Sequence, residues 1–197
     1  MKLKKSFYFN DDVCDAARNL LGKVLYVEGP EGICGGMIVE TEAYSYRERA
    51  CHAYGNRRTA RTETLFSAGG SAYVYLCYGI HRLFNVVTNA EGIAEAVLIR
   101  ALEPVTGVEL MKSRRGNIAY TGLTSGPGKL SEALSISLEH DGRPLLGDQI
   151  WISDEGVGVR KIVEGPRIGV DYAGEDALLP WRFGIGGNRF LSRPFPR

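Results

Sequence analysis

Alternating apolar and polar positions run through much of the chain and predict β-strands rather than long helices. The expected strands are rich in Val, Ile, Leu and Tyr, which fit a pleated, half-buried surface. Five of them cover residues 23–27, 36–44, 72–77, 84–88 and 96–102, and three shorter ones cover 149–152, 160–162 and 181–183.

Helical spacing is confined to short segments between these strands. The first helix is expected over residues 12–21, with Asn10 or Asp11 as its N-cap. Two further helices should begin near Pro104 and Pro127, because proline is favoured in the first turn of a helix. Strands joined mainly by turns, with helices at intervals, indicate an α+β fold with a largely antiparallel, curved sheet and flanking helices.

Length and composition refine this picture. A chain of 197 residues suits a single compact domain, and 25 glycines favour turns and close backbone contacts. No repeat or low-complexity linker divides the chain, so one domain is expected over residues 1–197. Neither a signal sequence nor an apolar run long enough to span a bilayer is apparent, which predicts a cytoplasmic protein, associated with the nucleoid if the host is a bacterium.

The four cysteines form no CxxC pair and have no histidines at zinc-finger spacing, so no metal site is expected. They are interpreted as small buried residues in a reducing compartment. The chain also lacks a dinucleotide-binding fingerprint and a P-loop, so no cofactor is implied.

The strand expected over residues 36–44 concentrates carboxylates on one face. Strict alternation would group Ile38, Glu40, Glu42 and Tyr44. A carboxylate held among aromatic rings is desolvated, which raises its basicity and allows it to take a proton from water. Two such carboxylates, roughly 7 Å apart at the backbone, could also serve as the acid/base pair of a sugar hydrolase. The simplest alternative is a surface acid in a salt bridge.

Basic residues supply a second kind of candidate chemistry. Arg100 lies in an apolar strand and needs an anionic partner, either at a functional site or in a structural pair with Glu103. The net charge is only +1, but arginines cluster between residues 45 and 62 and again after Asp176. Such clusters could bind phosphates, or the side chains could simply be solvated. The candidates for contact with a phosphate backbone are Arg57, Arg58, Arg61 and, near an expected helix N-terminus, Lys129.

Four separated motifs occur in an order that resembles one enzyme family. They are Glu-Thr-Glu-Ala-Tyr at 40–44, Tyr-Val-Tyr to Tyr-Gly at 73–79, Leu-Ile-Arg-Ala-Leu-Glu-Pro at 98–104 and Ser-Gly-Pro-Gly-Lys-Leu at 125–130. Between about Leu20 and Arg189 the chain is similar to the alkyladenine (3-methyladenine) DNA glycosylases of the mammalian type. That family has a single compact domain of mixed topology.

The resemblance assigns roles to the motif residues. It implies that Glu42, rather than Glu40, is the general base that deprotonates a water molecule held by Arg100. Tyr44, His52 and Tyr75 would form an aromatic pocket that favours a cationic alkylated purine. The same rings could otherwise be plain core, and His52 a hydrogen-bonded loop residue.

Further positions of the motif would handle the DNA duplex. Tyr78 matches a tyrosine that intercalates and fills the space left by a flipped nucleotide. Asn85 matches a pocket asparagine that disfavours the exocyclic amino group of guanine. His81 stands where mammalian members carry another aromatic residue, and the loop between Tyr44 and His52 is one residue shorter here.

The implied activity is that of a monofunctional, monomeric DNA glycosylase of base excision repair. It would flip 3-methyladenine, 7-methylguanine or hypoxanthine out of double-stranded DNA that carries the damaged purine, with etheno-adenine left open, and hydrolyse the N-glycosidic bond. One alternative is a hydrolase of free nucleosides, which would not need Tyr78. The other is a non-enzymatic nucleic-acid-binding module, which would gain nothing from Glu42 near phosphates.

Overall fold

The fold was taken from a computed structural model that describes residues 1–196. Within that range eight strands pair in antiparallel fashion in one sheet, which confirms the predicted α+β class. The strands are β1 (Val24–Gly29), β2 (Gly32–Ser45), β3 (Ala72–Cys77), β4 (His81–Val87), β5 (Glu95–Thr106), β6 (Ile150–Ser153), β7 (Ile162–Gly165) and β8 (Arg182–Ile185).

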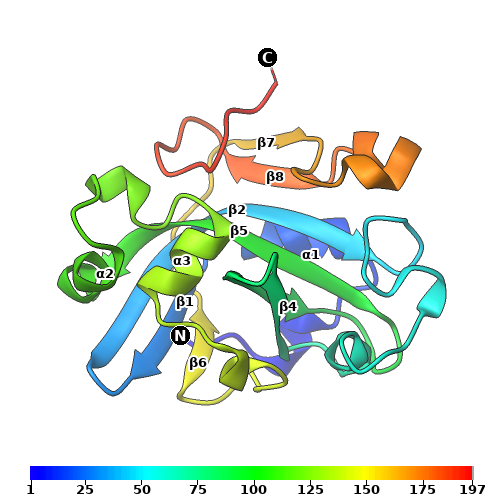
Figure 1. Cartoon of the computed structure of the whole chain (residues 1–197), viewed down its shortest axis with the longest axis horizontal. Coiled ribbons are helices and arrows are strands. Elements are labelled where there is room, and N and C mark those ends of the chain that lie inside the picture. The colour runs from blue at the N-terminus through cyan, green and yellow to red at the C-terminus, as the bar shows by residue number, and fades with distance from the viewer. Residues whose placement is uncertain (197) are drawn as a thin grey trace.

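The two longest strands, β2 and β5, form the centre of the sheet and cross the whole molecule (Figure 1). The sheet order is β3-β4-β5-β2-β1-β6, and β7 and β8 leave this path as a pair. Along its far edge β2 pairs first with β1 and then, over residues 40–42, with β8. The carboxylate-bearing half of β2 is therefore flanked by strands on both sides.

Three α-helices, α1 (Val13–Leu20), α2 (Val108–Arg115) and α3 (Pro127–Ala133), flank the sheet. Figure 1 shows α1 behind the sheet and α3 in front of it, beside β4. Asp12, one residue later than expected, caps α1, because its carboxylate accepts from the backbone N–H groups of Cys14 and Asp15. Proline at the start of α3 confirms the prediction for Pro127.

The helix expected to start near Pro104 begins only at Val108, and the placement of Pro104 in its first turn is wrong, because Pro104 lies inside β5, opposite Gly36. Here β5 has only one strand neighbour, since its pairing with β4 ends at Leu98. Proline is tolerated in such an edge-like position. The chain turns into α2 only after Gly107, whose φ of 71° is open to glycine at little cost.

Short 3₁₀ segments complete the connections between these elements. They are η1 (Lys5–Tyr8), η2 (Tyr54–Asn56), η3 (Glu63–Phe66), η4 (Tyr120–Gly122), η5 (Leu138–His140) and η6 (Asp171–Leu178). No helix within residues 1–196 has the length and apolar character needed to cross a bilayer.

The main core includes residues of α1, α3 and the sheet, among them Leu20, Phe84, Ile99 and Leu130, all of which are buried. A smaller cluster packs where the loop after β2 meets β3 and β5, and it contains Tyr73. This smaller cluster carries the aromatic wall of the site described next.

All four cysteines are free, and two of them, Cys34 and Cys51, are buried.

Candidate active site

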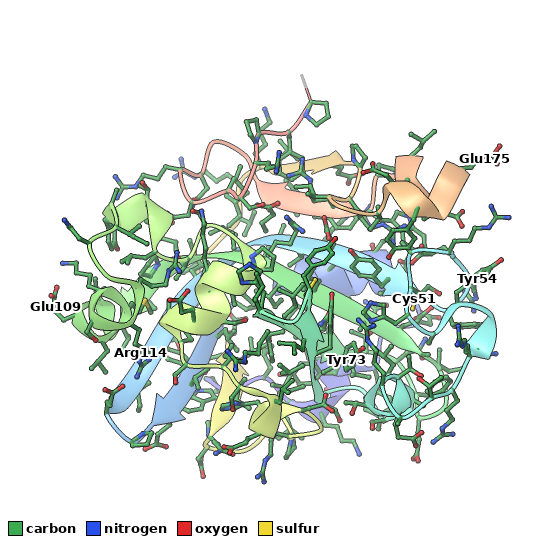
Figure 2. The ribbon with its side chains drawn as sticks, in the orientation of Figure 1. Cys51, Tyr54, Tyr73, Glu109, Arg114 and Glu175 are labelled. Carbon is green, nitrogen blue, oxygen red and sulfur yellow. The ribbon has the colours of Figure 1, made fainter. Side chains whose placement is uncertain are left out.

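One cavity of about 640 Å³ brings together most of the residues that the sequence singled out. Its walls come from β2, the loop after it, the β3–β4 hairpin, β5, the start of α3 and residues 168–172. Cys51 and Tyr73, which both line it, appear on the right of Figure 2, well away from Glu109 and Arg114 of α2. The candidate residues that line it are Tyr44, His52, Arg61, Tyr75, Tyr78, Asn85, Arg100 and Lys129.

Glu42 lies directly behind this wall and is fully buried. Its Oε2 accepts a hydrogen bond from the Tyr44 hydroxyl at 2.8 Å and lies 3.2 Å from Arg100 Nη1. Its Oε1 accepts the backbone N–H of Ile168 at 2.7 Å. Tyr44, Arg100 and Ile168 all line the cavity, so the groups that bind the carboxylate form part of the cavity wall. The alternative of a surface acid is wrong.

Arg100 joins the two carboxylates of β2. Its Nε donates to Glu40 Oε1 at 3.1 Å while Nη1 faces Glu42. The register of β2 against β5 shifts between Glu40 and Thr41, which leaves Arg100 in a bulge. Burial acts to lower the pKa of Arg100, but Glu42 and then Glu40 outweigh it, so the pKa is raised and the guanidinium stays charged. The structural pair with Glu103 is wrong, because Glu103 binds Asn188.

The position of the Arg100 guanidinium also tests the predicted alternation of side chains along β2. Glu40, Glu42 and Tyr44 do face the same side, as their contacts show. Ile38 instead joins the main core, and a second register shift separates it from Glu40. Because Arg100 lies between the two carboxylates, a sugar cannot enter between them, and this geometry contradicts the acid/base pair of a sugar hydrolase.

Two buried arginines of this site were not predicted as members of it. Arg167 makes a double hydrogen bond to Glu48, at 2.8 Å from each nitrogen, and its guanidinium lies 4.8 Å from the Tyr44 ring. Arg182 donates from Nη1 to Glu40 Oε1 at 3.1 Å. Arg182 belongs to the arginine cluster after Asp176 for which phosphate binding is predicted, and that prediction is wrong for Arg182 because only 3% of it is exposed.

Tyr44 is fixed both at its hydroxyl, by Glu42, and at its ring, by Arg167. Burial and then the charge of Glu42 raise the pKa of its hydroxyl well above the usual value, so Tyr44 is a neutral donor to that carboxylate. Arg167 packs on its ring and also donates to the carbonyl of Ala43. The ring orientation is therefore fixed by contacts that come from a distant part of the chain.

His52 has a tautomer that its neighbours define. Arg61, which can only donate, lies 3.3 Å from Nε2, so Nε2 is the acceptor and Nδ1–H donates to the Tyr73 hydroxyl at 3.0 Å. Burial and then the charge of Arg61 lower the pKa of His52 to about 4, so the ring is neutral. Its edge meets Tyr75 with centroids 4.6 Å apart, and Arg61 lies 5.3 Å from the Tyr75 ring.

Asn85 and the start of α3 form a further part of the cavity wall. The Asn85 amide donates to the carbonyl of Tyr73 at 3.2 Å, which anchors a buried polar group beside the rings. At Gly128 an added Cβ would lie 2.8 Å from His81 Nδ1, so a glycine is needed for α3 to approach the hairpin. Lys129 follows directly and lines the cavity.

Tyr78 lies at the tip of the β3–β4 hairpin and is 87% exposed. Ile80 N–H donates to the carbonyl of Cys77 across the turn, and both central residues have positive φ, 50° for Tyr78 and 73° for Gly79. This is the requirement of a type I′ turn. A bulky residue rarely adopts positive φ, so the turn holds an apolar ring in solvent at some cost in backbone strain.

The remaining arginine candidates lie on the exposed loop after β2. Arg57 and Arg58 are exposed, and Arg58 Nε donates to Glu63 Oε2 at 2.9 Å. No three His, Cys, Asp or Glu side chains converge on a possible metal position anywhere in residues 1–196.

Comparison with known proteins gives a consistent result. A family model described as methylpurine-DNA glycosylase (MPG) matches residues 7–189. A protein of Bacillus licheniformis is 48% identical over 94% of both chains, and one of Rhodopseudomonas palustris strain HaA2 is 49% identical over 95% of this chain and 89% of its own. A Chlamydia felis protein is 46% identical over 92% of this chain and 94% of its own. All three carry the name "Putative 3-methyladenine DNA glycosylase".

Proposed function

The chain belongs to the methylpurine-DNA glycosylase family, so it is a DNA glycosylase that acts on DNA, and we propose how its site releases a base. The substrate is a purine carrying an alkyl group or a hypoxanthine, flipped from duplex DNA into the cavity. Water is the nucleophile at C1′ of deoxyribose. The single observation that carries this proposal is the buried Glu42, bound by three residues that line an aromatic cavity.

Glu42 acts as general base in this mechanism. As the C1′–N bond breaks, the sugar becomes oxocarbenium-like and the purine leaves with the bonding electrons. A nearby carboxylate stabilises that positive charge and takes a proton from the water whose oxygen bonds to C1′. Arg100 supports the proposal because it is charged, lines the cavity and contacts the same carboxylate.

The aromatic wall selects the base. Tyr44 and Tyr75 both line the cavity, and cation–π attraction to such rings favours a purine that alkylation has made cationic. A purine such as 3-methyladenine or 7-methylguanine fits this chemistry best, whereas neutral hypoxanthine and etheno-adenine would depend on hydrogen bonds with His52 and Asn85.

Tyr78 distinguishes a duplex enzyme from a nucleoside hydrolase. Its ring is exposed at a turn beside the mouth of the cavity, where an aromatic wedge could replace the stacking of a flipped nucleotide. A hydrolase of free nucleosides would have no use for an apolar side chain held in water. We therefore favour the duplex as substrate, with Arg57, Arg58, Arg61 and Lys129 as contacts to phosphates and one protomer as the active unit.

The test is base release under single-turnover conditions. Duplexes that each contain one 3-methyladenine, 7-methylguanine, hypoxanthine or etheno-adenine are incubated with excess protein, and abasic sites are then cleaved with alkali. We expect strand breaks with alkali only and fastest release of the cationic bases. Release from free nucleosides at an equal rate, or a covalent protein–DNA adduct after borohydride, would contradict the duplex and water assignments respectively.

A further inference from the structure

The last residues of the chain pack against the buried charges behind the cavity. Ser192 N–H donates to Glu40 Oε2 at 2.5 Å, and its hydroxyl donates to Glu40 Oε1 at 2.8 Å. The same hydroxyl oxygen accepts from Arg100 Nη2 at 3.3 Å. One serine near the C-terminus thus touches both a buried carboxylate and the guanidinium that contacts Glu42. We call residues 192–195 the C-terminal strap.

Arg182 fastens this strap to the sheet. Its guanidinium donates to the carbonyls of Arg193 and Pro194, at 3.3 and 3.1 Å. The Phe195 ring lies 3.8 Å from the same guanidinium. At Gly184 an added Cβ would come within 2.6 Å of Phe195, so the strap lies directly on β8. These contacts hold the strap in place from one end to the other.

The strap matters because of the charges beneath it. Glu40, Glu42, Arg100 and Arg182 are each at most 6% exposed, and their formal charges cancel. Buried ions are stable only with good geometry and filled hydrogen-bond positions. Arg100 meets this need by directing Nε to Glu40, Nη2 to Ser192 and Nη1 to Glu42. Without the first two contacts the planar guanidinium could rotate away from Glu42.

We propose that Ser192 of the C-terminal strap and Glu40 are positioning residues that aim Arg100 at Glu42. The inference rests on the proposed role of Glu42 and Arg100. The strap lies beyond residue 189, where the match to the family model ends, so the assignment comes from the contacts of this chain. Neither residue lines the cavity, and each acts through Arg100 rather than on the DNA.

The experiment compares Ser192→Ala, which keeps the backbone N–H bond to Glu40, with Ser192→Thr, which restores the hydroxyl. Ser113→Ala, an exposed serine on α2, is the matched control. We expect Ser192→Ala to slow single-turnover base release by roughly tenfold or more, because the hydroxyl makes hydrogen bonds to both Glu40 and Arg100. Affinity for lesion duplexes should stay within the range of Ser113→Ala, the melting temperature should fall because a buried hydrogen bond is lost, and Ser192→Thr should recover both the rate and the melting temperature.

Two outcomes would overturn the inference. One is an unchanged rate in Ser192→Ala, and the other is a slower rate that is explained by weaker DNA binding or is not recovered in Ser192→Thr. If the wild type releases no base, the proposed function fails, but the strap can still be judged. The Arg100 side-chain Nε–H resonance should then shift in Ser192→Ala and return in Ser192→Thr, and a resonance that does not move contradicts the inference.

Discussion

The polar network behind the cavity and the exposed rim in front of it are built in opposite ways. In the network, Glu42 and Arg100 are buried, and each has at least three polar contacts within the protein. At the rim, Tyr78 is 87% exposed, and the arginines of the loop after β2 are exposed as well. The buried groups are therefore preorganised within the protein, whereas we propose that the rim obtains its main partners from the DNA.

This contrast predicts where substitutions act. Removing a group from the buried network leaves its former partner charged and without a counter-ion, which is costly at low dielectric. Removing a rim side chain leaves the fold intact, because water replaces what is lost. Losses of rate and stability should therefore belong to the network, and losses of DNA affinity to the rim.

The largest effect is expected for Glu42→Gln. An amide cannot take a proton from water, so single-turnover base release should fall by about 10²–10⁴-fold while lesion DNA still binds. Glu103→Gln is the control and should retain its rate, because Glu103 lies on β5 and binds Asn188 rather than Arg100. Base release by Glu42→Gln within a few-fold of wild type would remove Glu42 as the general base.

A substitution in the buried pair of Glu48 and Arg167 tests whether the stability of the fold depends on the buried network. Glu48 is 3% exposed and binds both terminal nitrogens of Arg167. Glu48→Ala leaves that guanidinium buried without its carboxylate, so the free energy of unfolding should drop by about 3–5 kcal/mol. Urea titration measures it. A drop below 1 kcal/mol would show that the network tolerates an unpaired charge, and the contrast with the rim would be lost.

Some residues of the site could be predicted from the sequence and others could not, for a physical reason. Glu42 and Arg100 stand within motifs on adjacent strands, so the resemblance of these motifs to a known family singled them out, although alternation alone did not separate Glu42 from Glu40. Arg167, Arg182 and Ser192 reach the site from the far end of the chain, and only tertiary contacts reveal their partners. In the same way most strands followed from alternation, but the course of β5 through Pro104 depended on which strands lie beside it.

His52 lies between the buried network and the exposed rim. The pH dependence of stability that it causes measures how strongly this position is shielded from water. Its pKa is lowered from 6.5 to about 4 in the folded protein, so the unfolded chain binds the proton more tightly. Stability is complete above pH 6.5 and falls as the pH drops toward 4, by at most about 3 kcal/mol and less where solvent screens the ring. Urea titrations at pH 7 and pH 4.5 measure this loss. Between these two pH values the free energy of unfolding should fall less for His52→Gln than for wild type, by up to this amount. Identical pH profiles would contradict the burial of this ring.

Tyr78→Ala probes the rim directly. Because an aromatic wedge contributes stacking of about 1–3 kcal/mol, affinity for a lesion duplex at fixed salt should fall by roughly 5- to 100-fold. The effect should shrink when the lesion is mispaired, since less stacking is lost on flipping. The melting temperature should stay close to that of wild type, because the ring is exposed and alanine is strained at this positive φ much as tyrosine is. Equal affinity of the two proteins for paired lesion DNA would exclude the wedge.

The smallest effect is expected for Glu63→Ala, which breaks the exposed counterpart of the Glu48–Arg167 pair. Glu63 binds Arg58 in the loop after β2, and both side chains are more than half exposed. Water hydrates Arg58 when its partner is gone, so the free energy of unfolding should change by no more than the error of the measurement. Loss of the carboxylate frees Arg58 for phosphate, so DNA affinity should stay equal or rise at low salt and lose the gain at high salt. A stability loss as large as that of Glu48→Ala would mean that the rim is as tightly built as the network, and affinity that falls at low salt would remove Arg58 from the phosphate contacts.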